Sequence, residues 1–156
     1  MANVNNPNGF RAVKSLSGSY LPTFSYMTKT NVAIKAGDAV IMLSNGTIDI
    51  ALAASATIFG VSQSTLTAES GVSKKILVVP ASKDIVFSGQ CSGTYTPVNA
   101  GESVDIEGAT GVMQVNEDAQ STNVLRIVGL EGGLNNAVGA NARVLFTWCK
   151  SQWAGD

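Results

Sequence analysis

The apolar segments of this chain are short, and residues that favour turns separate them. Pro80, Gly89, Gly93 and Gly101 are examples of this punctuation. No long segment repeats its apolar residues with the helical period of 3.6, which disfavours a parallel βαβ arrangement. Many short strands at such spacing are typical of a sandwich or barrel. We therefore predict an all-β chain folded as a compact antiparallel β-barrel or sandwich, with strands near residues 57–62, 75–79, 84–88, 111–115, 123–130 and 143–149.

The clearest local signal is an Asn-Gly pair between two runs of strand-forming residues. Asn45 and Gly46 separate residues 38–43 from residues 47–52. Both central positions of a type I′ turn need positive φ, and Asn-Gly adopts it at low cost. The sequence therefore predicts a hairpin over residues 38–52 with a type I′ turn at Asn45-Gly46.

The N-terminal part of the chain differs from the rest. Residues 1–9 include four Asn, one Pro and one Gly without an apolar period, which predicts an extended arm. A first short strand follows from Phe10. We therefore divide the chain into residues 1–19, the extended arm with its first strand, and residues 20–156, a single β-rich domain. Tyr20, Phe24 and Tyr26 alternate along the next segment and are predicted to pack into the core.

Helical structure has little support in the sequence. Residues 53–56 (Ala-Ala-Ser-Ala) are the only local helical signal, and they are too few to nucleate a helix without tertiary support.

Composition excludes several classes of protein. With 45% hydrophobic residues and a net charge of −1, disorder of the whole chain is disfavoured. The basic residues are scattered, so we expect no nucleic-acid partner. No apolar segment approaches the roughly 20 residues of a membrane span, and we expect a soluble protein without a membrane partner. Near-neutral proteins repel one another weakly, which suits close assembly.

The two cysteines do not make a disulfide framework. Cys91 and Cys149 are expected as free thiols in a protein made in a reducing cytosol, with a single bridge between them as the alternative.

Candidate catalytic groups are few, because the chain contains no histidine. Its absence removes the commonest general base and the commonest zinc ligand. Asp105 and Glu107 share one strand face and are interpreted as surface acids. Glu117-Asp118 is interpreted as a solvated turn, since it lacks the distal ligands of a calcium loop. Cys91 is interpreted as an idle thiol. We predict no catalytic, cofactor or metal site, no small-molecule substrate and no enzyme activity.

Two tryptophans lie near the C-terminus. Trp148 falls inside a predicted strand and is expected in the core. Trp153 lies in the tail, where an indole either docks on its own chain or serves as a subunit or capsid contact. The sequence leaves both alternatives open.

Three segments together resemble a known family. Residues 2–13 (Ala-Asn-Val-Asn-Asn-Pro-Asn-Gly-Phe-Arg-Ala-Val) combine an Asn-rich start with Gly-Phe-Arg-x-Val. Residues 125–130 (Leu-Arg-Ile-Val-Gly-Leu) and 136–146, which include Gly-Ala-Asn-Ala-Arg-Val-Leu, form the closing motifs. The chain resembles the capsid decoration, or cement, proteins of tailed bacteriophages.

The resemblance implies a β-tulip-like body that assembles as a homotrimer. It implies that the protein is made in the host cytoplasm and then binds the major capsid protein on the outer surface of the virion, where it stabilises the expanded head. A phage head-fibre base and a glycan- or receptor-binding β module are the alternatives. The expected capsid or subunit contacts are Asn3, Val4, Asn5, Asn6, Pro7, Phe10, Arg11 and Trp153.

Overall fold

The computed structural model describes residues 3–153 of the chain. Residues 1 and 2 of the predicted arm, and residues 154–156, lie outside the described part. Within it, regular structure consists of β-strands and one short 3-10 helix, η1 (Pro97–Asn99). The all-β prediction is confirmed. The strands are β1 (Arg11–Ser15), β2 (Phe24–Met27), β3 (Ala39–Met42), β4 (Ile48–Ile50), β5 (Gly60–Ser62), β6 (Lys75–Pro80), β7 (Ile85–Gln90), β8 (Thr94–Tyr95), β9 (Ser103–Glu107), β10 (Gln114–Asn116), β11 (Leu125–Leu130), β12 (Gly139–Ala140) and β13 (Arg143–Trp148).

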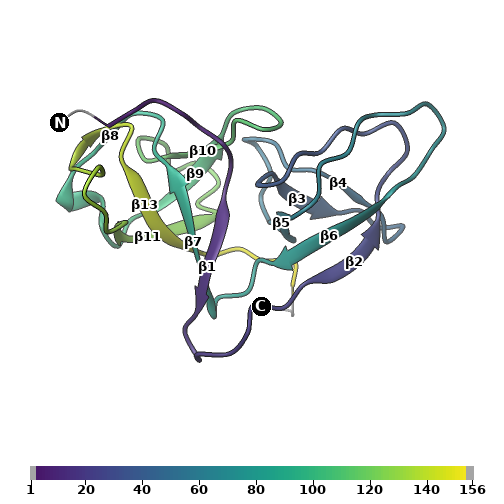
Figure 1. Ribbon diagram of the computed structural model, residues 1–156, viewed down its shortest axis with the longest axis horizontal. Helices are drawn as coiled ribbons and strands as arrows, with labels where there is room; N and C mark the ends of the chain where they lie inside the picture. Colours follow the sequence, from purple (N-terminus) through teal and green to yellow (C-terminus); the bar gives the residue numbers. More distant parts are fainter. Residues whose placement is uncertain (1–2, 154–156) are drawn as a thin grey trace.

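The strands form two main antiparallel sheets that pack as a sandwich. The first has six strands in the order β1-β7-β13-β11-β9-β10, and the second has five in the order β2-β6-β5-β3-β4. A small ribbon pairs β12 with β8. Figure 1 shows the two sheets on opposite sides of the molecule, with the chain passing between them after β1, after β6 and after β13. The chain therefore passes repeatedly from one sheet to the other, and neither sheet is formed by one continuous half of the sequence.

The hydrophobic core joins the two sheets. Its larger cluster combines Phe87, Phe146 and Trp148 of the six-stranded sheet with Val61 and Val79 of the five-stranded sheet. A smaller cluster belongs to the second sheet and contains Ile34, Val40, Ile48, Phe59, Ile76 and Val78. Trp148 is fully buried, as predicted.

The hairpin predicted over residues 38–52 is present, but its turn differs from the prediction. β3 and β4 pair antiparallel, with Val40 opposite Ile50. Leu43 N–H donates to the Thr47 carbonyl at 2.8 Å, and Gly46 N–H donates to the Leu43 carbonyl at 2.9 Å. Gly46 has φ +79°, whereas Asn45 is not among the residues with positive φ. The connection is thus a three-residue loop closed by one left-handed glycine, not a type I′ turn.

The predicted row of core aromatics is only partly correct. Tyr20 is 99% exposed, so its assignment to the core is wrong. Phe24 is partly exposed, and Tyr26 packs edge to face against Phe59 at 5.0 Å. The strand begins only at Phe24, so an alternation that starts at Tyr20 includes residues outside the sheet.

The C-terminal tail connects the sheets a third time. Ser151 forms a parallel bridge with Ile58. The Gln152 amide both accepts from Met42 N–H at 2.9 Å and donates to the Met42 carbonyl at 3.0 Å. Residues after β13 therefore hold the five-stranded sheet against the six-stranded one.

Candidate functional site

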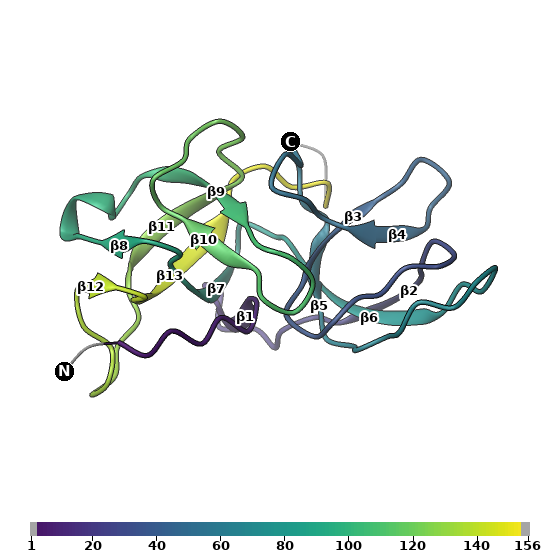
Figure 2. The same cartoon turned by 90° about the horizontal axis from the view of Figure 1, so that it is seen from above.

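The segment before β1 lies along the body of its own chain. Asn3 makes three hydrogen bonds with the loop around β12: its amide donates to the carbonyls of Ala137 and Ala140, both at 2.8 Å, and accepts from Ala137 N–H at 2.9 Å. Figure 2 shows the segment passing beside β12 before it reaches β1. The predicted extended N-terminal arm is not confirmed.

A second anchor is the side chain of Gln90, at the end of β7. Its amide donates to the Val4 carbonyl at 2.9 Å and accepts from Asn6 N–H at 3.1 Å. The backbone of this segment is thereby fixed, while the side chains of Val4, Asn5 and Asn6 remain exposed and Pro7 is half-buried. Val4, Asn5 and Asn6, three of the predicted contact residues, are thus held in place with their side chains accessible.

The segment enters the body at Gly9. Gly9 has φ +78°, and a Cβ there would lie 2.5 Å from the Gly37 carbonyl oxygen. Phe10 N–H donates to that oxygen at 2.7 Å. Only glycine permits this approach of two backbones, so Gly9 fixes where the chain crosses the turn before β3.

Phe10 fills a position in the core. It is 3% exposed, and its ring lies edge to face against Phe146 and Trp148 at 5.3 and 5.6 Å. The sequence analysis assigns residues 1–19 to an arm with its first strand, whereas the Phe10 side chain packs in the core of the β body. Gly89 makes room for the ring, because a Cβ on Gly89 would lie 2.7 Å from Phe10.

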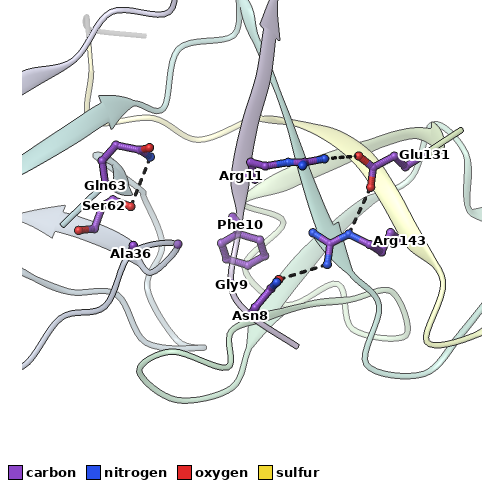
Figure 3. A pocket seen from close by; sticks show the side chains of 10 residues that line it. Asn8, Gly9, Phe10, Arg11, Ala36, Ser62, Gln63, Glu131 and Arg143 are labelled. Atoms are coloured by element: carbon purple, nitrogen blue, oxygen red, sulfur yellow. Dashed lines mark hydrogen bonds and ion pairs between the residues drawn. The ribbon is translucent and has the colours of Figure 1, made fainter. Parts of the chain in front are cut away.

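Arg11 belongs to a charged cluster formed by the strands β1, β7 and β13 and by Glu131, the residue directly after β11. Its Nη2 donates to Glu131 Oε1 at 2.7 Å, and Arg143 Nε donates to Glu131 Oε2 at 3.2 Å. Ser88 donates to the same Oε2 at 2.6 Å. Arg143 also reaches back to the Asn8 side chain at 3.2 Å. Figure 3 shows the Arg11 and Arg143 side chains converging on Glu131.

The cluster carries an excess positive charge. Partial burial of Glu131 favours a higher pKa, but the Ser88 hydroxyl and the two guanidinium groups outweigh it and hold the pKa of this carboxyl below its usual value. One carboxylate thus faces two cations. The Arg11 side chain is 68% exposed, which leaves it accessible to an acidic group on a partner.

The cluster borders a cleft of about 560 Å³ between the two sheets. Residues 8–11 and 36–37 line it together with Ser62 and Gln63, while Glu131 and Arg143 lie on its far side. The cleft is lined by both polar and apolar groups, with the charged side chains of Arg11, Glu131 and Arg143 at one edge.

Trp153 lies elsewhere. Its indole packs against Phe24 and Phe59, with ring centroids 4.9 and 5.4 Å apart. The structure thus shows intramolecular docking of Trp153 on the five-stranded sheet, away from the cleft. A contact of the half-buried indole with a partner stays a prediction.

The candidate site also contains residues that the sequence analysis did not select: Gln90, Glu131 and Arg143. Only 13% of the residues are charged, so a charged residue at the border of a predicted strand is unusual in this chain. Glu131 and Arg143 could have been selected from the sequence on this ground. Nothing in the sequence singles out Gln90, because its role depends on which segment of the chain lies across the end of β7.

The acids considered for chemistry have structural surroundings. Asp105 is 4% exposed, so its assignment to a solvated face is wrong. Its carboxylate accepts from Ser121 N–H and Oγ, Thr122 N–H and Asn123 N–H at 2.6–2.9 Å. Burial opposes ionisation, but these hydrogen bonds outweigh it and hold the pKa of Asp105 far below its usual range.

Glu117 also differs from its prediction. It forms a turn with Asp118, as expected, but it is 2% exposed and not solvated. Within the described chain neither carboxylate oxygen accepts a hydrogen bond of good geometry. Burial and the nearby Asp118 raise its pKa. Burial, with Glu117 beside it, also raises the pKa of the Cys91 thiol, which opposes a nucleophilic role.

Both cysteines are free, with Cys91 buried and Cys149 half-buried. Across residues 3–153 no group of three or more His, Cys, Asp or Glu side chains is arranged to hold a metal ion. The same residues contain no helix long and apolar enough to cross a membrane. Comparison of the chain with protein-family models, with curated proteins and with solved structures finds no match.

Proposed function

We propose that this protein is a structural virion protein that decorates the outside of a tailed-phage capsid, bridging neighbouring major capsid proteins and stabilising the expanded head. One observation carries the proposal. The first segment on which the family resemblance rests lies more than a hundred residues before the other two, yet all three meet at one cluster: Arg11 from the first, Glu131 directly after the second, and Arg143 from the third. The motifs that carry the resemblance therefore contribute to, or border, one cluster in the folded protein.

The docked N-terminal segment supports a role in contact with a partner. Side chains of Val4, Asn5 and Asn6 are exposed while their backbone is held by Gln90 and the β12 loop. A segment ordered before binding loses less conformational entropy when it binds. The capsid contact we propose combines these side chains with the cleft and with Arg11.

A trimer is part of the proposal. The net charge of −1 opposes self-association only weakly. In sedimentation equilibrium we expect a mass three times the 16.1 kDa of the chain. A monomer at all concentrations tested would remove the trimer from the proposal without affecting capsid binding.

Capsid binding is tested by co-sedimentation with expanded capsids that lack this protein. We expect saturable binding at a fixed ratio to the major capsid protein. Arg11→Ala removes the exposed cation at the cleft, and we expect binding to weaken by roughly tenfold, or about 1.4 kcal/mol. Arg126→Ala is the matched control, because Arg126 is exposed on β11 and donates to the Gly101 carbonyl, outside the cleft. Absence of saturable binding would overturn the proposal.

A further inference from the structure

A second hollow lies at the other end of β1, away from the charged cleft. Its volume is about 320 Å³, at the small end of the range for ligand sites. Ser15 and Ile85 contribute from the six-stranded sheet, and Phe24 and Pro80 from the five-stranded sheet. The proposed capsid contact uses none of these residues.

One wall of the hollow is aromatic. Phe24 and Trp153 lie with ring centroids 4.9 Å apart and an interplanar angle of 34°, and Phe59 supports Trp153 from the core side. Phe24 is 42% exposed, and Tyr20, which also lines the hollow, is 99% exposed. Neighbouring exposed apolar side chains often mark a binding site. Because Phe24 and Trp153 pack against each other, the hollow offers the exposed part of the Phe24 ring rather than a cage of rings around a point.

The hollow is also lined by polar residues, Ser15, Ser19, Ser82 and Asp84, and Ser17 lies next to them. Asp84 accepts from Ser15 Oγ at 2.6 Å and from Ser17 Oγ at 2.9 Å, and Ser17 Oγ is in turn 2.9 Å from Ser19 Oγ. The Ser15 and Ser17 hydrogen bonds lower the pKa of Asp84, which keeps it ionised. This row of hydroxyls around a carboxylate offers both donors and acceptors to a ligand.

We propose that this hollow binds a neutral sugar residue, with one face of the sugar ring on the exposed Phe24 ring and its hydroxyl groups bound by Asp84 and the neighbouring serines. A sugar ring has an apolar C–H face and a polar edge, which match the aromatic and the polar residues that line the hollow. The Asp84 carboxylate disfavours an acidic sugar. A quaternary ammonium ion binds best where aromatic rings surround it on several sides, as in an aromatic cage.

The test is titration of the full-length protein with glucose, galactose, mannose and N-acetylglucosamine, followed by tryptophan fluorescence and by saturation-transfer NMR. Trp153 lies in the hollow and should respond, whereas Trp148 is fully buried and should not. We expect saturable binding of at least one of these sugars. Glucuronic acid and choline chloride are the discriminating probes, and we expect neither to bind as tightly.

Two variants locate the binding. Asp84→Asn and Tyr20→Ala are exposed substitutions, and each should raise the dissociation constant at least fivefold. Leu134→Ala, an exposed position after β11, should leave it unchanged. The proposal is overturned if no neutral sugar saturates the signal, if both variants bind like the wild type, or if choline or glucuronate binds at least as tightly as the best neutral sugar.

Discussion

Phe10 and Trp148 meet edge to face in the core, with ring centroids 5.6 Å apart and an interplanar angle of 89°. Phe10 immediately precedes the first strand, and Trp148 ends the last one. The two ends of the β body are therefore joined through aromatic packing. Only the residues before Gly9 can act as a separable attachment.

Phe10 should accordingly be a major contributor to stability. Phe10→Ala leaves a cavity between Phe146 and Trp148, and we expect the free energy of unfolding to fall by about 3–5 kcal/mol in urea denaturation. Val4→Ala, at a position 79% exposed, should change it by less than about 0.5 kcal/mol. Equal effects of the two substitutions would contradict the assignment of Phe10 to the core.

The loop of the β3–β4 hairpin depends on Gly46. No atom lies within 4 Å of a Cβ placed there, so substitution acts through the backbone φ of +79° alone. We expect Gly46→Val to lower the free energy of unfolding by about 1 kcal/mol or more, because a β-branched residue fits this region poorly. Gly132→Val is the control, since Gly132 is equally unobstructed and has no positive φ. A neutral Gly46→Val would show that the loop adopts another conformation.

Asp105 should make stability depend on pH in the acid range. Its pKa is lowered in the folded state, so its contribution is present above the ordinary aspartate pKa of about 4 and is lost on acidification. Asp105→Asn removes acceptors from the N–H groups of residues 121–123, and we expect a loss of about 1–3 kcal/mol at pH 7. The difference from the wild type should narrow below about pH 4. Thermal unfolding measured from pH 2 to pH 8 checks this, and Glu107→Gln, two residues along β9, is the control.

Glu117 should have the opposite pH dependence. Its pKa is raised by burial and by Asp118, so the folded state favours the protonated form and stability is lost as the pH rises above the ordinary glutamate range. Glu117→Gln should therefore be more stable than the wild type at pH 8, and this advantage should disappear near pH 4. If the variant is less stable at pH 8, the buried carboxylate has stabilising partners and the interpretation fails.

Local patterns predicted much of the fold. The β13 region alternates residues that the structure places alternately in the core and towards the surface, and the Asn-Gly pair located the hairpin. The exact turn could not be predicted, because Asn-Gly is compatible with both a two-residue and a three-residue connection. The two-residue strands β8 and β12 carry too little periodicity to detect.

The site was less predictable. Arg11 was selected, but its partners Glu131 and Arg143 are more than a hundred residues away in the sequence, and only the strand order β1-β7-β13-β11 brings them together. Burial of Asp105 and Glu117 was missed for a related reason. An acidic residue is assigned to the surface from sequence alone, because the position of the loop that covers it depends on the tertiary fold.

The most direct test of the proposed function is electron cryomicroscopy of expanded capsids incubated with this protein. The account predicts added density on the outer surface, repeated at the junctions between neighbouring major capsid proteins, with the Val4–Asn6 side chains and Arg11 at the contact. Density inside the shell, or a reconstruction identical to that of the bare capsid at saturating protein, would contradict it.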